Sequence, residues 1–447
     1  MLFLPFIILV VFTACIIKNK TWAFCFYMVC RLLLPPIVRV GPVSMNTFMS
    51  FIMLATIILS YKKLDRQQKK MFFPIGALIL PLGIFSFFGV IPYDIVYRNL
   101  FQFFMTEICP CLFLIICLKS SKDVRQILLF IGLSYIIVGI WGIITYLLKM
   151  NPLYTFFMLT FAGDYEVSDF TGDGFGSLRG SLLGAASGNL SGPLPWGQES
   201  MLVALFFLFF KDVKKNPKYL IITIVVLAVI NTFLSGKRSC LLPIIIFYAF
   251  YFWRSKLFSL KNVFLSIFVL VTAFIVISSF PIFNQINKNI ESTIFFWDDN
   301  VDRKNNVDGS SLEMRQSQFE CANQMISNHV FCGLGYDYPS YYSSIRGLHP
   351  VMFGFESIYF SVIVSSGLLG LLVWFLFFRR IILLSYKNKN DLDFILAYHF
   401  GFLLSCLLTA IQSSLWIYMI FSYLYVQNKK CIKKEKVNEV INSNSSL

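Results

Sequence analysis

Three groups of cations lie at positions of the chain where an anion could bind. Arg179 lies in a stretch rich in Gly and Ser, and Lys237 and Arg238 form the centre of a Ser-Gly-Lys-Arg-Ser turn between two apolar segments. The third cation is Arg315, in a long hydrophilic segment. Arginine suits phosphate because its planar guanidinium donates two parallel hydrogen bonds and stays charged. These residue types therefore indicate a site for an anionic headgroup or a diphosphate.

The sequence around Arg315 predicts an amphipathic helix that begins after Ser310 and ends near Ser327. Ser310 and the glutamate three residues later match a capping box. Apolar residues recur along the segment at helical spacing: Leu312, Phe319, Ala322 and Ile326. Arg315 falls on this stripe. Snorkelling or an ion pair with Asp337 or Glu356 would explain it structurally, whereas a cavity that holds an anion would explain it functionally.

Structural explanations also exist for the other cations. Cations at helix ends can snorkel to the membrane interface, which would account for Lys237 and Arg238. Four acidic residues between 164 and 173 precede Arg179, so this arginine could form a local ion pair. A pair of adjacent cations on a face that is otherwise poor in Lys and Arg nevertheless favours an anion site.

Residue types that hold metals are sparse. The chain has no Cys-x-x-Cys, no His-Glu-x-x-His and only three histidines. Most of the 11 cysteines lie in apolar segments, where cysteine behaves as a small apolar residue. Cys321 and Cys332 lie in the long hydrophilic segment, either as a disulfide or as two thiols. We expect no metal site and no cofactor.

The elements that position these residues are membrane-spanning helices. Hydrophobic residues make up 57% of 447 positions and the mean hydropathy is +0.71, which is typical of an all-α polytopic membrane protein. We expect about 12–13 spans, since each needs about 20 apolar residues. The predicted spans are 2–17, 45–60, 71–91, 99–118, 126–148, 197–210, 218–234, 240–253, 262–280, 356–378, two within 393–427 and an ambiguous one at 21–38.

The net charge of +15 reflects membrane topology. Most of the 38 Lys and Arg residues lie in six short segments at alternate connections between spans: 61–70, 119–125, 211–218, 254–261, 379–390 and 427–437. The positive-inside rule assigns such segments to the cytoplasm. Residues 149–196, 235–239 and 281–355 then share the external face. This distribution argues against a nucleic-acid partner.

The resulting organisation has six parts. They are N-terminal transmembrane helices at 1–148, an external loop at 149–196, central transmembrane helices at 197–280, a large external loop at 281–355, C-terminal transmembrane helices at 356–427 and a cytoplasmic basic tail at 428–447. The large external loop is expected to carry short helices.

The order of several short motifs resembles the superfamily of O-antigen polymerases and O-antigen ligases, most closely its polymerase branch. The motifs are the Arg-Gly at 179–180, the Ser-Gly-Lys-Arg-Ser turn, Arg315, Val-Phe-Cys-Gly-Leu-Gly-Tyr at 330–336, Glu-Ser-Ile-Tyr at 356–359 and Gly-Leu-Leu-Gly at 367–370. The resemblance covers roughly residues 175–380. Ligases of this group typically have His-Asn where this chain has Glu356-Ser357, which favours the polymerase.

The resemblance implies a periplasmic active face in the bacterial inner membrane and the transfer of a glycan from an undecaprenyl-diphosphate carrier to a sugar hydroxyl. It implies that Arg179, Arg238 and Arg315, with Lys237, bind the diphosphate. The candidate general base is Glu356 or His349. Tyr338 and Tyr359 are candidate glycan contacts, although aromatic residues are common at membrane interfaces. A chain-length regulator protein is a candidate partner.

Two alternatives stay open. One is the ligase of the same superfamily, which passes finished polymer to a lipid core. The other is a flippase or transporter of lipid-linked oligosaccharide. A transporter would place its cations near the middle of the membrane, whereas the candidate cations here lie at the ends of spans or in external segments.

Overall fold

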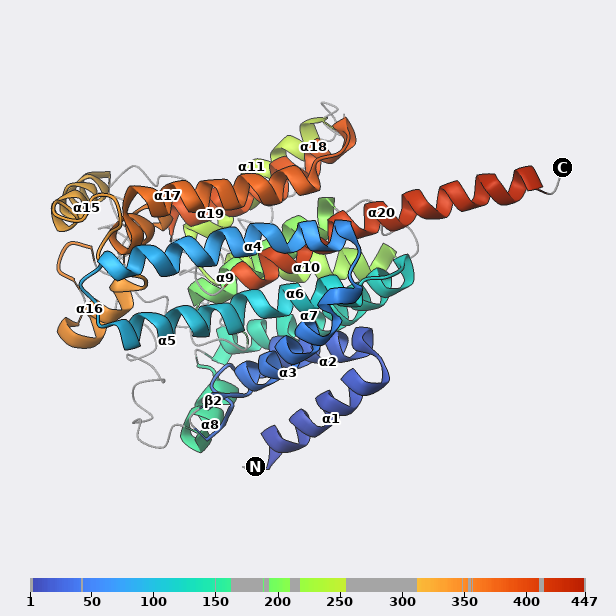
Figure 1. Cartoon of the computed structure of the whole chain (residues 1–447), viewed down its shortest axis with the longest axis horizontal. Helices are drawn as coiled ribbons and strands as arrows, with labels where there is room; N and C mark the ends of the chain where they lie inside the picture. Colours follow the sequence, from blue (N-terminus) through green and yellow to red (C-terminus); the bar gives the residue numbers. More distant parts are fainter. Residues whose placement is uncertain are drawn as a thin grey trace, which may run out of the picture.

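The computed structural model describes residues 3–41, 43–148, 150–161, 188, 193–209, 218–254, 312–347, 349–352, 355, 357–409 and 414–445. Within these residues the chain is helical, with one pairing of two short strands, β1 (Arg39–Val40) and β2 (Val43–Ser44) (Figure 1). The predicted all-α architecture is confirmed. The predicted span at 262–280 lies outside the described residues, as do residues 162–187 of the loop predicted at 149–196 and residues 281–311 of the loop predicted at 281–355.

Five helical stretches of the described residues are long and apolar enough to cross a membrane. They contain α3 (Met45–Ser60), α4 (Arg66–Phe85), α5 (Tyr93–Phe103) continued by the π-helical turn Phe104–Ile108 and α6 (Cys109–Cys117), α7 (Ser121–Leu148) and α17 (Ile358–Ser385). Shorter helices complete the bundle: α1 (Leu4–Lys18), α2 (Lys20–Leu33), α8 (Pro152–Phe161), α9 (Pro193–Phe209), α10 (Lys218–Leu234), α11 (Arg238–Arg254), α18 (Leu392–Phe394), the π-helical turn Ile395–Phe400 and α19 (Gly401–Leu408). The ambiguous segment 21–38 is helical up to Leu33.

The last helix, α20 (Leu415–Ser445), begins in the middle of the bundle. Residues 415–426 are all buried, as expected for a helix that is surrounded by others. Aromatic rings pack it in place, since Phe421 stacks on Phe206 of α9 at 4.2 Å and Tyr425 stacks on Phe394 at 3.8 Å between ring centroids. The segment 393–427 therefore contains two helical elements, as its composition predicts.

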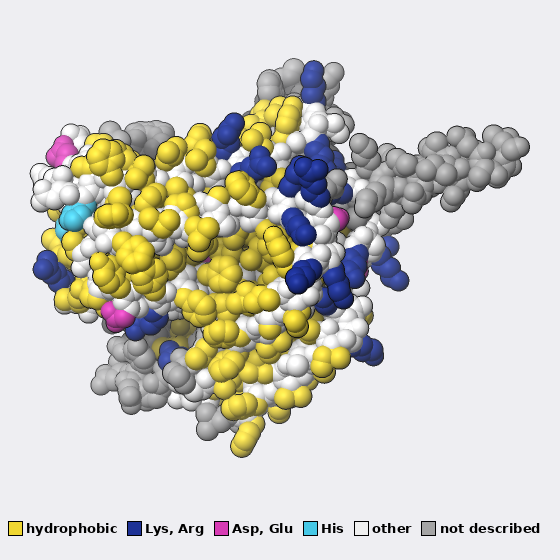
Figure 2. Space-filling view, in the orientation of Figure 1, with side chains coloured by type: hydrophobic (Ala, Val, Ile, Leu, Met, Phe, Trp, Pro, Cys, Tyr) yellow, Lys and Arg dark blue, Asp and Glu magenta, His cyan; other side chains and the backbone are white. Residues whose placement is uncertain are grey.

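Basic residues collect at one end of this bundle, which we call the basic end. Hydrogen bonds there join Lys20 to Ser60, Thr21 to Asp123 and Gln427 to Leu118, and Lys429 forms an ion pair with Asp391. Figure 2 shows Lys and Arg gathered where α20 leaves the bundle, next to a broad apolar surface. This asymmetry agrees with the charge pattern of the sequence.

The opposite end carries a small folded cap, which we define as the described residues of 312–357. It contains α15 (Leu312–Met325) and α16 (Tyr338–Arg346). Its apolar side chains form a core of their own against the start of α17: Ala322, Ile326, Leu334, Met352, Phe355, Phe360, Ile363 and Val364. The connection between α4 and α5 lies at the same end, because the Val90 backbone N–H donates to the Leu334 carbonyl at 2.8 Å.

Candidate functional site

Two glycine motifs of the sequence fasten the cap to the membrane bundle. Helix α17 is interrupted at Gly367, whose φ is +64°. The backbone of 330–335 pairs with this break, since Leu334 N–H donates to the Val364 carbonyl at 2.8 Å and Leu368 N–H donates to the Val330 carbonyl at 2.9 Å. Gly333 has a φ of +71°, and a Cβ at this position would overlap the Ser366 backbone nitrogen. Only glycine fits such a close approach of two backbones.

The same cap segment contacts the connection between α4 and α5. A Cβ at Gly89 would lie 2.6 Å from the Leu334 carbonyl oxygen, and the Tyr336 backbone N–H donates to the Ser86 hydroxyl at 3.1 Å. The cap is therefore held between α17 and the beginning of α5. This docking determines which side chains of the two parts meet.

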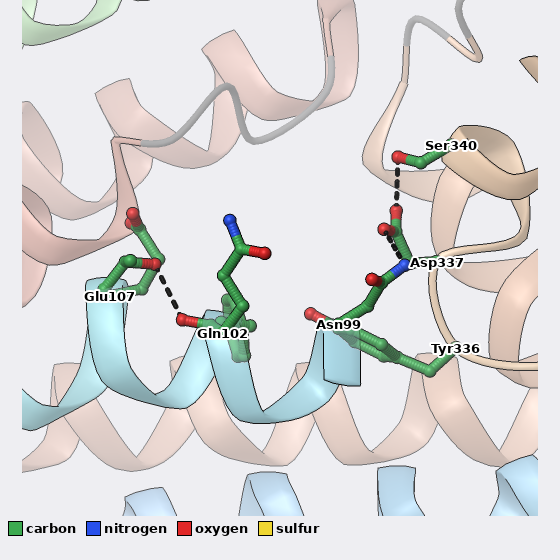
Figure 3. A pocket seen from close by; sticks show the side chains of 8 residues that line it. Asn99, Gln102, Glu107, Tyr336, Asp337 and Ser340 are labelled. Carbon is green, nitrogen blue, oxygen red and sulfur yellow. Dashed lines mark hydrogen bonds between the residues drawn. The ribbon is translucent and has the colours of Figure 1, made fainter. Parts of the chain in front are cut away.

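A pocket of about 340 Å³ lies where the cap meets α5. Asn99, Gln102, Phe103, Thr106 and Glu107 line one wall, and Tyr336, Asp337 and Ser340 line the other. Figure 3 shows Glu107 and Asp337 at opposite ends of the pocket, with the Gln102 amide between them. Asn99 and Glu107 are eight residues apart, so the wall extends about 12 Å along the helix axis.

Asp337 is held in place by hydrogen bonds to both of its carboxylate oxygens. Its two carboxylate oxygens accept hydrogen bonds from the Asn99 amide at 3.0 Å and from the Ser340 hydroxyl at 2.7 Å. Its backbone is left-handed, with φ of +61°, a conformation that aspartate tolerates better than most residues. Burial raises the pKa of the Asp337 carboxyl, and the hydrogen bonds from Ser340 and Asn99 oppose that shift.

Glu107, at the inner end of the pocket, belongs to a buried ion pair. Its carboxylate accepts from Arg31 of α2 at 3.3 Å and from the Trp416 backbone N–H, in the first turn of α20, at 3.0 Å. The Arg31 guanidinium also lies 4.8 Å from the centre of the Trp416 ring. Both charged side chains are about nine-tenths buried. Sequence reasoning missed this pair, although a glutamate inside a predicted span is itself a sign of a specific partner.

Arg315 lies at the outer end of α19. Its guanidinium donates to the Leu408 carbonyl at 2.9 Å and to the Gln318 side-chain oxygen at 3.3 Å. The predicted helix around it is confirmed as α15, but its predicted buried stripe is partly wrong. Phe319 is 47% exposed and stacks on Tyr359, whereas Gln318 is fully buried. The buried face holds Gln318 because its amide donates to the Val351 carbonyl.

The turn with Lys237 and Arg238 leads into helix α11, which packs against the same helix α19. Gly236, with φ of +65°, permits the turn, and Arg238 begins α11. The side chain of Arg238 lies outside the described set, as do Arg179, Ser310 and Glu356 altogether. A chain of polar groups continues inward from this region, from Ser405 of α19 to Gln198 of α9 and on to Ser414 before α20. Arg315 and the cationic turn are therefore attached to neighbouring elements at the cap end.

His349 organises the cap backbone. Its Nδ1 accepts hydrogen bonds from the backbone N–H groups of Val351 at 3.1 Å and Met352 at 3.0 Å. An imidazole that accepts at Nδ1 carries its proton at Nε2 when it is neutral. Burial lowers the pKa of His349, which favours this neutral form. Nε2 then has no lone pair to take a proton, so this geometry does not favour His349 as a general base.

The two tyrosines proposed to contact glycan differ in their surroundings. Tyr338 begins α16 directly after Asp337, beside the rings of Tyr341 and Tyr342 at 6.4 and 6.1 Å between centroids. Tyr359 lies in the first turn of α17, and its ring stacks on Phe319 at 5.6 Å. Tyr338 therefore lies next to the pocket, whereas Tyr359 contributes to the packing of α15 on α17.

Comparison with known families agrees with this arrangement. No curated protein matches the chain closely enough to count as a relative. Residues 200–375 match the family model described as O-antigen ligase. The matched stretch includes α10, α11, the cap and the first part of α17, and excludes the α5 wall of the pocket. This match to part of the chain supports a relationship to the O-antigen ligase and polymerase superfamily, whose members transfer glycans, and the apolar helices are those of a multi-pass membrane protein.

Proposed function

We propose that this protein is an O-antigen polymerase, which joins undecaprenyl-diphosphate-linked oligosaccharide repeat units at the periplasmic face of the bacterial inner membrane. The observation that carries the proposal is the position of Arg315. Its guanidinium is held at the outer end of α19 by the Leu408 carbonyl, and α19 packs against α11, the helix that follows Lys237. Cations at the membrane surface suit a ligand whose lipid lies in the membrane and whose diphosphate lies at its edge.

In the proposed reaction a sugar hydroxyl of one lipid-linked unit attacks the anomeric carbon of another. The bond between that carbon and the diphosphate oxygen breaks, and negative charge develops on the leaving diphosphate. Arg315, Lys237 and Arg238 would stabilise this charge, with Arg179 as a further contact. One cation about 4 Å from a phosphate charge contributes roughly 4 kcal/mol at an effective dielectric constant near 20.

The reaction also needs an acceptor for the hydroxyl proton. Of the two candidates from the sequence, Glu356 is preferred, because Nδ1 of His349 already accepts two backbone hydrogen bonds. Tyr338 and Tyr359 remain proposed glycan contacts. The proposed activity makes lipid-linked oligosaccharide the substrate and a chain-length regulator protein a candidate partner.

Deletion of the gene and electrophoresis of the lipopolysaccharide test the proposed reaction. We expect single repeat units on the lipid A-core and no ladder of longer chains. Complementation with Arg315→Ala should give the same single unit, and Arg315→Lys should restore only part of the ladder, because an ammonium cannot form the bidentate contact. Gln316→Ala, at the exposed neighbouring position, is the matched control. A normal ladder with Arg315→Ala, at normal protein abundance in the membrane, would contradict the diphosphate role.

A ligase is the second candidate, because the matching family model carries that description. A ligase attaches the glycan to the lipid A-core. Its deletion would therefore remove all O-antigen from the lipid A-core, including the single repeat unit. The same gel distinguishes the two reactions.

A further inference from the structure

The pocket between α5 and the cap differs chemically from a diphosphate site. None of its eight lining residues is Lys or Arg, and two of them, Glu107 and Asp337, are carboxylic acids. The Asp337 carboxylate would repel a phosphate, because like charges repel, whereas the charge of Glu107 is paired with Arg31. The ligand that suits this pocket is therefore uncharged or cationic.

The polar groups of the pocket match an uncharged ligand with many hydroxyl groups. A hydroxyl both donates and accepts, so it needs acceptors and donors side by side. The pocket offers carboxylate oxygens from Asp337 and Glu107 and a side-chain amide from Gln102, which Figure 3 shows pointing into the space between them. Phe103 of the α5 wall and Tyr336 of the cap wall, with ring centroids 5.8 Å apart, supply an apolar surface where the two walls meet.

The pocket is also rigid at its cap end. Asn99 and Ser340 hold the two oxygens of Asp337, and Asp337 joins parts of the chain that are 238 residues apart. A polar group that is already oriented loses less conformational freedom when a ligand binds. The volume of about 340 Å³ lies at the small end of the range of roughly 300–1,000 Å³ for ligand pockets, which suits a short glycan.

We infer that this pocket binds the sugar whose hydroxyl accepts the transferred glycan, through Gln102, Asp337 and the neighbouring polar side chains. The assignment to the acceptor rests on the proposed function, since only a transferase has an acceptor. Binding of an uncharged, hydroxyl-rich sugar follows from the pocket itself. One wall comes from the family-matched region and the other from α5 outside it, so α5 supplies contacts that the matched region alone does not.

The test uses the full-length protein in lipid nanodiscs and two soluble probes. One probe is the repeat-unit oligosaccharide, released by mild acid from the lipid-linked precursor of the same cells. The other is inorganic pyrophosphate. Titration of each probe against tryptophan and tyrosine fluorescence gives its dissociation constant and shows whether the probes compete.

Two variants change the polar groups of the pocket with little change in side-chain size. Gln102→Leu removes a side-chain amide that forms no hydrogen bond with the side chains or backbone of the described residues. Asp337→Asn removes the charge but keeps a residue type that tolerates a left-handed backbone. Each should raise the dissociation constant of the oligosaccharide about fivefold, the equivalent of one hydrogen bond of about 1 kcal/mol. Gln316→Leu makes the same replacement on exposed α15 and should leave it unchanged.

The outcomes separate this inference from the proposed function. Absence of saturable oligosaccharide binding by the wild type at millimolar concentrations, unchanged affinity in both pocket variants, or competition by pyrophosphate would overturn the sugar pocket. Weaker pyrophosphate binding in Arg315→Ala, with oligosaccharide binding unchanged, would support two separate sites. If Arg315→Ala changes neither pyrophosphate binding nor polymer length while Gln102→Leu weakens sugar binding, the diphosphate site is wrong and the sugar pocket remains.

Discussion

The cap end of the molecule contains two polar regions of opposite charge. At the outer end of α19 lies the cation Arg315, and α19 packs against α11, the helix that follows Lys237. In the pocket beside α5 the charged residues are the acids Glu107 and Asp337. In the proposed reaction both lipid-linked units carry a diphosphate, but only the sugar of the acceptor takes part. A surface that was basic throughout would attract both diphosphates and would not select this uncharged sugar. This difference is what the two proposed roles, diphosphate binding and acceptor binding, depend on.

The two regions also differ in how they are built. Arg315 contacts a helix-end carbonyl through a single long side chain, which adjusts readily. The pocket exists only when the cap is docked, since its walls come from α5 and from 336–340. Changes that release the cap should therefore remove the pocket first.

The largest expected effect comes from Gly333→Ala. The new Cβ would overlap the backbone of Ser366 and Gly367 at a φ of +71°, so the cap cannot dock and polymer formation should be lost. Gly347→Ala is the matched control, because its φ is +74° but no atom lies within 4 Å of the added Cβ. It should cost about 1–3 kcal/mol of backbone strain and keep activity. Limited proteolysis measures how firmly the cap is docked in each variant, and the lipopolysaccharide ladder measures polymer formation. Equal results for the two variants would contradict a role of Gly333 in cap docking.

The second largest effect is expected from Arg31→Met, which leaves the Glu107 carboxylate buried without its cation. Loss of one partner of a buried pair costs about 3–5 kcal/mol. The double variant Arg31→Met with Glu107→Gln should recover most of this, since glutamine can still accept from the Trp416 N–H. Thermal unfolding in detergent measures the stability, with Arg98→Met on exposed α5 surface as the control. If the double variant is as unstable as Arg31→Met, the unpaired charge of Glu107 at the inner end of the pocket is not the cause of the lost stability.

The spans could be predicted from the sequence because they depend on local composition. The apolar runs at 45–60, 99–118, 126–148 and 356–378 coincide with helices, and α7 begins before its predicted start because polar residues continue a helix outside the apolar layer. The presence of a helix around Arg315 also followed from local periodicity. The buried side of that helix could not be predicted from periodicity. Gln318 is buried instead of Phe319 because its amide donates a hydrogen bond to the Val351 carbonyl, which is distant in the sequence.

The pocket could not be predicted, because its contacts join distant parts of the chain. The hydrogen bond from Asn99 to Asp337 depends on how the cap docks, and no local pattern encodes that. The glycines at 333 and 367 were visible as motifs, but their contact with each other was not. The pairing of Arg31 with Glu107 would have been easier to predict, because two opposite charges in apolar segments already indicate that each has a partner.

A smaller effect should come from a cation placed inside the pocket. Gln102→Arg would add a positive charge between Glu107 and Asp337, so the oligosaccharide should bind about tenfold more weakly. Pyrophosphate should gain a second, weak site. The change should not affect the ability of Arg315 to bind the first pyrophosphate. Unchanged sugar affinity in this variant would mean that the oligosaccharide binds elsewhere.

The smallest effect concerns pH. A carboxylate accepts stronger hydrogen bonds from hydroxyls than a protonated acid does, so sugar binding should weaken as the pH falls through the pKa of Asp337. Because burial raises that pKa above its usual 3.8, the loss should begin at a higher pH than for an exposed aspartate.

The same raised pKa means that ionised Asp337 destabilises the fold, so its contribution to stability is greatest below pH 3.8 and is lost as the pH rises. In Asp337→Asn the remaining sugar affinity should no longer fall in this pH range. If the affinity of this variant still falls as it does in the wild type, the titrating group is Glu107 or His349. A pocket that loses affinity on acidification while pyrophosphate binding at Arg315 does not would separate the two regions by their chemistry as well as by their place in the fold.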